Sequence, residues 1–437
     1  MNVLIRKIMI LLCGCISIII ANLIDSIVAL VSLMYAYATM VVWVNAKNGA
    51  ADPRVFPLAF MAVYFTFFPL RAYFFGSGNL PYDDEVLVTS LRLQFLAMVV
   101  FVTVSNLFLA DRRQQFDNPF HSFKYRSAPS ERLIFLCILP FIIYPVMVIL
   151  SSGASSKREI LDSLSTIKML SDFALLILTV LVFIRAVRVG LLFYRDIAIL
   201  LYMLFCVFYV LLTGERDILF KVLFGFLIIY YDQRKNFNFF KMIGIFAVLV
   251  FVVPISQYFK GVLLVGEVAF DRVGWDLILY SEFMSASRNF YSLLVFDVDQ
   301  NISFLVSDVF RAFVPTMLVG DTNVQSTVAW FERVFRPENG FSGTSGWGFT
   351  IVGFGYMIGG FSGIVLIMVF YAWLLALLYN LRWKSLYWYA FYILALAAFV
   401  YVLRADLANL LSLLFKISGL CVLLVYGAHQ LVCRKLY

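Results

Sequence analysis

The 437 residues of this chain are 63% hydrophobic and only 14% charged, and the mean hydropathy is +0.93. Soluble domains carry about 45–50% apolar and about 25% charged residues, so this composition excludes an ordinary water-soluble enzyme. The formal net charge of +8 does not indicate a nucleic-acid partner, because the basic residues flank apolar runs, as membrane proteins place them.

The apolar residues form continuous runs of about 20 residues, the length that spans a bilayer of about 30 Å as a helix. A transmembrane β-barrel shows alternating segments of about 10 residues instead. The sequence therefore predicts an all-α polytopic membrane protein with about twelve transmembrane helices. The runs fall near 8–24, 26–44, 56–75, 88–110, 133–150, 167–184, 196–213, 217–231, 242–259, 347–378, 386–403 and 407–427.

The distribution of Lys and Arg predicts the orientation of these helices. With the N-terminus placed in the cytoplasm, nineteen Lys and Arg fall in cytoplasmic segments and five in the short outer segments. Cytoplasmic loops carry such an excess, so both termini are expected in the cytoplasm. The chain then divides into transmembrane helices 1–9 (1–259), one large outer loop (260–346) and transmembrane helices 10–12 (347–437).

The outer loop contains too many aromatic residues, such as Trp275, Phe290 and Trp330, to remain solvated. Its segments 275–290 and 302–313 mix apolar and polar residues at helical spacing. They predict short amphipathic helices that lie on the outer leaflet or dip into it.

Common motifs of soluble enzymes are missing from the sequence. It contains no P-loop, no dinucleotide-binding fingerprint and no nucleophile elbow. Both histidines, His121 and His429, fall on the cytoplasmic side. All six cysteines lie in or beside apolar runs, so neither a metal site nor a cofactor is expected on the outer face.

Arginine is the main candidate for chemistry on the outer face. It is costly near a bilayer, and its guanidinium presents a fixed fork of donors that suits phosphate. The alternative is that each arginine pairs with a neighbouring carboxylate, among them Glu215, Asp217, Asp271 and Asp406, or extends to the interface. The candidates are Arg216 and Arg404 in short turns, and Arg272, Arg288 and Arg311 in the loop.

Glycine is the second signal. The stretch 340–363 reads GFSGTSGWGFTIVGFGYMIGGFSG. Close packing of membrane helices explains the glycines from Gly353 to Gly363. Gly343 and Gly346 precede the expected helix, where glycine allows the backbone to approach a ligand.

The layout resembles the oligosaccharide repeat-unit polymerases of bacterial surface polysaccharides, the Wzy-type O-antigen or capsule polymerases. A long outer loop ends in a Gly/Ser-rich segment and runs into a helix of the form Gly355-Tyr356-x-x-Gly359-Gly360. A Gly-x-Arg turn, Gly214-Glu215-Arg216, lies between two earlier helices. The resemblance covers most of the chain, and its two short motifs are degenerate.

The resemblance implies a glycosyltransferase of the bacterial inner membrane that acts at the periplasmic face without a metal or cofactor. It would transfer a growing glycan from one undecaprenyl pyrophosphate carrier to a new lipid-linked repeat unit, beside a chain-length regulator or alone. Fixed guanidinium groups would stabilise the pyrophosphate leaving group. The expected catalytic residues are Arg216, Arg288 and Arg311 with Asp276 or Glu282 as base, and the other candidates for the base are Asp271, Asp297, Asp299 and Glu338. The expected binding residues are Arg272, Arg404, Asp406, Gly343, Gly346 and Tyr356.

Three alternatives remain open at the level of sequence. A lipid-linked oligosaccharide flippase or another transporter needs charged residues deep in several helices, and Lys168, Asp172, Lys221 and Lys416 are the few available. An O-antigen ligase has a similar layout, but the histidine expected in its outer loop is missing here. An acyltransferase or lipid-binding scaffold is the third, although outer-face acyltransferases usually need a histidine.

Overall fold

The fold is entirely helical in the residues that the structure, a computed structural model, describes. These are residues 3–78, 80–109, 128–152, 157–214, 216–234, 237–255, 283–314, 327–335 and 348–435. The predicted all-α class is therefore confirmed.

The described helices include two with unusual geometry, a 3-10 helix (η1) and a π-helix (η4). In chain order they are α1 (Val3–Leu23), α2 (Ile27–Ala46), α3 (Phe56–Phe75), α4 (Asp84–Phe108), α6 (Ala128–Ile138), α7 (Pro140–Ser151), α8 (Lys157–Val189), η1 (Gly190–Arg195), α9 (Ile197–Thr213), α10 (Arg216–Arg234), α11 (Phe239–Ile255), α14 (Met284–Val295), α15 (Ser303–Phe313), α17 (Thr327–Val334), α18 (Ile351–Leu381), α19 (Leu386–Val402), α20 (Leu407–Leu411), η4 (Ser412–Gly419) and α21 (Leu420–Lys435).

Eight helical segments in the described ranges are long and apolar enough to cross a membrane. Three more apolar helices, Ile197–Thr213, Phe239–Phe251 and Leu386–Val402, are shorter. The chain thus has the fold of a polytopic membrane protein. The two narrowest separations between predicted runs are confirmed, because separate helices lie on either side of each. One is the break from Leu23 to Ile27, and the other is Gly214, whose left-handed conformation (φ 71°) ends α9.

Short polar side chains begin several of these helices. The side chains of Ser26, Asp83, Asp196 and Ser385 each accept a hydrogen bond from a backbone N–H in the first turn of α2, α4, α9 and α19, respectively. Such caps pair the backbone N–H groups of the first turn, which have no partner within the helix. An unpaired N–H group is costly in apolar surroundings. The sequence thus marks where an apolar helix begins even though its interior is nearly uniform.

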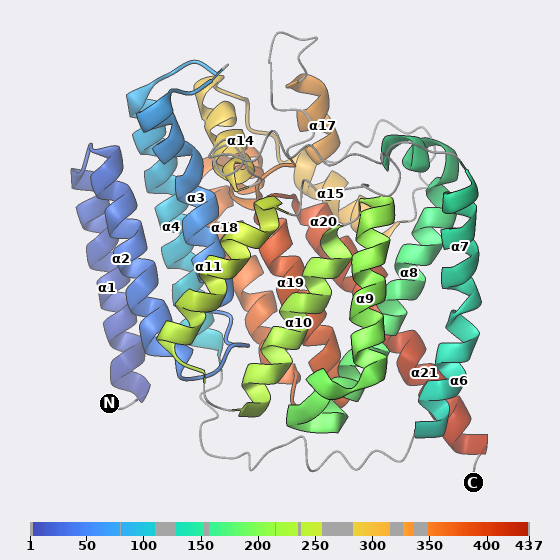
Figure 1. Ribbon diagram of the computed structural model, residues 1–437. Coiled ribbons are helices and arrows are strands. Elements are labelled where there is room, and N and C mark those ends of the chain that lie inside the picture. The colour runs from blue at the N-terminus through green and yellow to red at the C-terminus, as the bar shows by residue number, and fades with distance from the viewer. Residues whose placement is uncertain are drawn as a thin grey trace.

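Helix α19 forms the centre of the bundle and contacts α3, α8, α10 and α18 (Figure 1). Almost all its residues are buried, as expected for a helix that is apolar on every side. The outer helices instead expose large apolar side chains, such as Ile19 on α1 and Leu204 on α9. These outward faces are suited to lipid tails.

Three helices of the predicted outer loop, α14, α15 and α17, lie at one end of the bundle, opposite the start of α1 and the end of α21 (Figure 1). We refer to these three helices as the upper layer. Helix α15 exposes Val306, Phe310 and Phe313 along one side, in keeping with the predicted amphipathic character. Helix α14 differs, because its residues from Met284 to Leu293 are all buried. It packs against α3 and α4 instead of covering a surface.

Candidate anion-binding site

Helix α14 carries an unusual number of polar side chains into the protein interior. Ser285, Ser287, Arg288, Asn289 and Ser292 are all buried. The Ser287 hydroxyl accepts a hydrogen bond from the backbone N–H of Phe68, directly before Pro69 in α3. Buried polar groups are stable when such partners exist. The docking of α14 on α3 therefore has specific polar contacts in addition to apolar ones.

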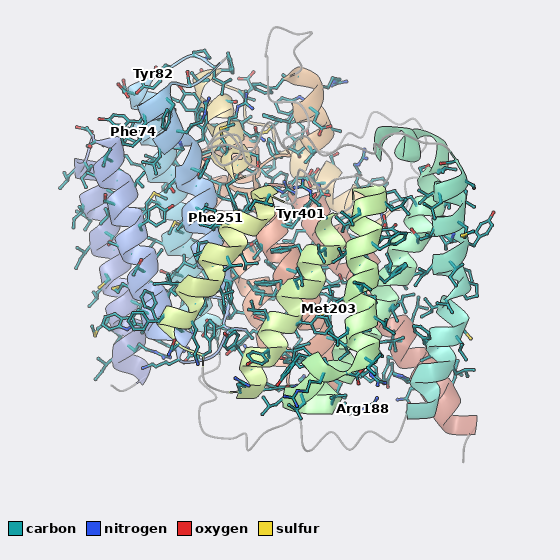
Figure 2. The ribbon with its side chains drawn as sticks, viewed as in Figure 1. Phe74, Tyr82, Arg188, Met203, Phe251 and Tyr401 are labelled. Carbon is teal, nitrogen blue, oxygen red and sulfur yellow. The ribbon has the colours of Figure 1, made fainter. Side chains whose placement is uncertain are left out.

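Tyr291 attaches α14 to the loop before α4. Its hydroxyl donates to the Pro81 carbonyl oxygen at 2.6 Å and accepts from the Asp83 N–H at 3.0 Å. Its ring packs on Phe68. Figure 2 shows Phe74 and Tyr82 at the upper end of α3 and α4. Tyr291 therefore fixes α14 at this end of the bundle and not in its middle.

Two buried arginines lie close together at this position. Arg288 on α14 is 6% exposed and Arg71 on α3 is 7% exposed. Burial and then the positive charge of Arg71 lower the pKa of Arg288 to about 10. Like charges in a poorly solvated place destabilise each other, and an anion between the two guanidinium groups attracts both. The pair therefore has the chemistry of a phosphate site.

The loop after α3 folds around Arg71. The guanidinium donates to the Gly76 carbonyl oxygen at 3.0 Å. Gly78 has φ 70°, and a Cβ atom there would lie 3.6 Å from Nη1 of Arg71. This loop holds the Arg71 side chain at the end of the helix that faces the upper layer.

Helix α18 is broken at Gly359 and Gly360, and its first part folds back along its second part. Gly355 lies so close to Gly363 that a Cβ atom on Gly363 would be 2.0 Å from the Gly355 carbonyl oxygen. The break frees the Met357 carbonyl oxygen, which accepts the N–H of Asn301 at 2.6 Å. Of the glycines predicted for close helix packing, Gly355 and Gly363 thus pack against each other within one chain segment, whereas Gly353 faces Phe290 and Leu293 of α14. Irregular backbone of this kind occurs at membrane depth only where protein or a cavity covers it.

Two hydrogen bonds join α14, the start of α18 and the turn after α19. The Asn289 side-chain N–H donates to the Gly348 carbonyl oxygen at 2.8 Å, and the Phe349 N–H donates to the Arg404 carbonyl oxygen at 2.8 Å. The Arg404 guanidinium lies over the ring of Tyr401, which Figure 2 places at the upper end of α19. The structure thus brings the region of Arg288 and that of Arg404 together.

Tyr356 belongs to the same region. It lies on the first part of α18, and its ring packs edge-on against Phe290, two residues after Arg288. The rings are 5.9 Å apart. The predicted binding residue is therefore next to α14, although the sequence separates the two by a long segment.

Asp406 has a buried acidic partner that the sequence did not predict. Both Asp406 and Asp308 on α15 are completely buried. Asp406 caps α20 by accepting the N–H of Asn409 at 2.8 Å, and it also accepts the N–H of Val328 at 3.1 Å. Both bonds hold helices of the protein in place.

Comparison of the chain with protein-family models, with curated proteins and with solved structures finds no match. The site is therefore defined by its own geometry. Within the ranges that the structure describes, no three His, Cys, Asp or Glu side chains form a group that could hold a metal ion.

Two other predicted catalytic arginines lie elsewhere on the described helices. Arg216 begins α10 directly after the Gly214 turn, where the neighbouring Asp217 forms an ion pair with Lys221. Arg311 lies in the last turn of α15, and its carbonyl oxygen accepts a hydrogen bond from Lys416. Five further predicted residues lie outside the described residues, namely Arg272, Asp276, Glu282, Gly343 and Gly346.

Sequence reasoning did not select Arg71 and Asp308. Arg71 lies in the apolar run 56–75, and an arginine within an apolar segment is itself a functional signal. Asp308 gave no comparable signal, because a lone aspartate in an amphipathic segment is usually solvated. Its significance depends on Asp406, which lies far away in the sequence.

Proposed function

We propose that the chain is a glycosyltransferase of the bacterial inner membrane that polymerises undecaprenyl-pyrophosphate-linked oligosaccharide repeat units at the periplasmic face. The observation that carries this proposal is the buried pair of Arg71 and Arg288 where α14 meets the bundle. Transfer from a lipid pyrophosphate creates negative charge on the leaving group. Two fixed guanidinium groups in a poorly solvated site stabilise that charge without reorganising.

The proposed topology has twelve crossings. The helices α6 and α7 together make one crossing, and α20, η4 and α21 make another. The start of α1 and the end of α21 lie at the same end of the bundle (Figure 1), which supports an even number. The excess of Lys and Arg between the runs on that side assigns it to the cytoplasm, and the upper layer then faces the periplasm.

The proposed roles follow the placement of the side chains. Arg288 and Arg71 hold the pyrophosphate, and Tyr356 and Arg404 contact the glycan beside it. Arg216 and Arg311 provide further positive charge at the periplasmic face. The base that accepts the proton of the attacking hydroxyl is proposed from the sequence alone, as Asp276 or Glu282, both of which lie outside the described residues.

The charged residues considered for a transporter have local structural partners. Lys168 pairs with Asp172 one turn further along α8, and Lys221 pairs with Asp217 on α10. Lys416 donates to the last carbonyl oxygens of α15. These contacts account for the charges without a transport pathway and support the polymerase over a flippase.

Complementation tests the proposal in a strain whose surface polysaccharide stops at a single repeat. We expect the intact gene to restore a ladder of chain lengths, and Arg288→Ala or Arg71→Ala to leave single repeats at normal protein level. Arg92→Ala is the matched control, because Arg92 is also a helical arginine but pairs with the exposed Asp25. Accumulation of repeats on the cytoplasmic side when the gene is lost would identify a flippase instead.

A further inference from the structure

Two buried carboxyl groups join the upper layer to the bundle. Asp308 lies in the middle of α15, and Asp406 lies immediately before α20. Neither side chain is exposed to solvent. Two carboxyl groups at a buried contact are unusual, because each negative charge destabilises the other.

Each of these carboxyl groups binds the beginnings of two helices. Asp308 accepts the N–H of Thr327 at 3.0 Å at the start of α17, and the N–H of Ala408 at 3.4 Å in α20. Asp406 accepts the N–H of Asn409 in α20 and the N–H of Val328 in α17. The positive ends of both helices therefore converge on the same pair of side chains. We call this arrangement the aspartate clasp.

Burial and, secondly, the charge of Asp406 raise the pKa of Asp308 to about 7, whereas hydrogen bonds from Thr327 and Ala408 act in the opposite direction. The pKa of Asp406 is also raised, mainly by burial. Other titratable or charged groups occur on the elements packed around the clasp. They are Arg311 on α15, Glu332 and Arg333 on α17, Tyr356 on α18, Tyr401 on α19, Arg404 in the turn and Lys416 on η4.

We propose that the aspartate clasp is a proton-operated latch that holds α17 on the bundle. When the pair holds one proton, only one negative charge is buried, and the two helix N-termini stabilise it. Loss of that proton leaves two buried carboxylates that repel each other, and the lower-energy arrangement releases the start of α17 so that both become hydrated. The latch is a property of the fold and does not depend on the proposed enzymatic activity.

The consequence of release follows from what α17 covers. Phe331 of α17 packs against Phe349 with 5.0 Å between ring centroids. Phe349 is the residue whose N–H is bonded to Arg404. Release of α17 therefore uncovers Phe349, the residue before α18 that is hydrogen-bonded to Arg404. This residue lies at the edge of the candidate site.

The direction of the pH effect follows from the raised pKa. The docked state holds the proton up to about pH 7, whereas a hydrated aspartate loses it near its usual pKa of about 3.9. Docking is thus strongest in acid and weakens as the pH rises through about 7. Between about pH 5 and pH 7 the equilibrium constant for release rises by up to about tenfold per pH unit, and above that it levels off.

Hydrogen–deuterium exchange of the full chain in lipid nanodiscs tests the latch directly, because the amides of Thr327 and Val328 are themselves donors in the clasp. We expect protection of the α17 peptide, corrected for intrinsic chemical exchange, to fall by up to about tenfold per pH unit over this range. In Asp308→Asn the side chain cannot ionise, and its one amide oxygen can still accept the N–H of Thr327 at the start of α17. Its α17 peptide is expected to stay protected at every pH.

Asp83→Asn serves as the matched control, because Asp83 caps α4 alone and is exposed. This variant should keep the pH dependence of the α17 peptide. Protection of α17 that does not change with pH in the native chain, or an unchanged slope in Asp308→Asn, would overturn the proposal. If Asp308→Asn fails to fold, the profile of the native chain and that of Asp406→Asn decide the question.

Discussion

Gly355 and Gly363 touch across the fold of α18, where the Gly355 carbonyl oxygen occupies the space that a side chain on Gly363 would need. Two residues eight positions apart in one straight helix would be separated by about 12 Å at a rise of about 1.5 Å per residue. Their contact therefore establishes that the first part of α18 returns along the second. This return brings Tyr356 toward α14.

Replacing Gly363 with alanine should disrupt this contact. A Cβ atom 2.0 Å from the Gly355 oxygen forces the two parts of α18 to separate, and overpacking of this kind typically costs about 1–3 kcal/mol or more. We expect a lower unfolding temperature of the purified protein in detergent and a loss of polymer in the complementation assay. Gly427→Ala is the control, because no atom lies within 4 Å of the new Cβ. Equal effects of the two substitutions would argue against the folded-back helix.

Gly348 should tolerate alanine even less than its backbone conformation alone predicts. Its φ is 78°, and a Cβ atom there would lie 2.5 Å from the Arg404 carbonyl oxygen, which already accepts the Phe349 N–H. Gly190 has φ 82° but nothing within 4 Å, so Gly190→Ala measures the conformational cost alone, about 1–2 kcal/mol. Thermal unfolding of both variants should show a larger loss for Gly348→Ala. A difference within experimental error would mean that the Arg404 turn is not rigidly held against Gly348.

The arginine pair should make the protein bind inorganic pyrophosphate. Binding to the folded state alone stabilises it by about 2.7 kcal/mol at a ligand concentration 100 times the Kd. We expect pyrophosphate to raise the unfolding temperature of the native chain and of Arg92→Ala, but not that of Arg288→Ala. Arg288→Lys should retain only part of the effect, since a lysine lacks the two-pronged donor geometry. A full response in Arg288→Ala would place the anion elsewhere.

Arg382, which follows α18 at the opposite end of the bundle, provides a test of stability. Arg382 is 6% exposed, donates to the Tyr379 carbonyl oxygen at 2.6 Å, and lies 3.3 Å from the ring centroid of Tyr379 and 4.5 Å from that of Trp383. Buried contacts of this kind stabilise by about 2 kcal/mol, and exposed ones by about 0.5–1 kcal/mol. Arg382→Met should therefore lower the unfolding temperature clearly more than Arg234→Met, where the exposed Arg234 lies over Tyr230. Similar losses would show that the rings around Arg382 do not contribute.

The helices could be predicted because the bilayer leaves the backbone few choices. An apolar run of about 20 residues has to satisfy its own N–H and C=O groups and therefore forms a helix. The narrow gap around Gly214 between two predicted runs is also confirmed, and the left-handed conformation of this glycine ends α9 there. Arg288 and Tyr356 could be predicted as site residues from local information too, namely their residue type and their position relative to the apolar runs.

The contacts of the site could not be predicted in this way. The run 347–378 predicts one continuous helix, because glycines suit both close packing and a break, and only the contact of Gly355 with Gly363 reveals the break. The partners of Arg288 and Asp406, which are Arg71 and Asp308, come from distant parts of the chain. Nothing local in the sequence encodes such proximity, since it results from how the helices pack.

The upper layer is fastened to both halves of the protein, since α14 packs on α3 and α4 whereas α15 packs on α20 and η4. A chain is made from its N-terminus, so α3 and α4 are already present when α14 is synthesised. Helix α15, in contrast, has to wait for α20, which emerges about 100 residues later. During that interval Asp308 remains hydrated and ionised. We expect its burial beside Asp406 to be among the last events of biogenesis, so that a chain cut short before Leu407 keeps an unfinished upper layer that quality-control proteases can recognise.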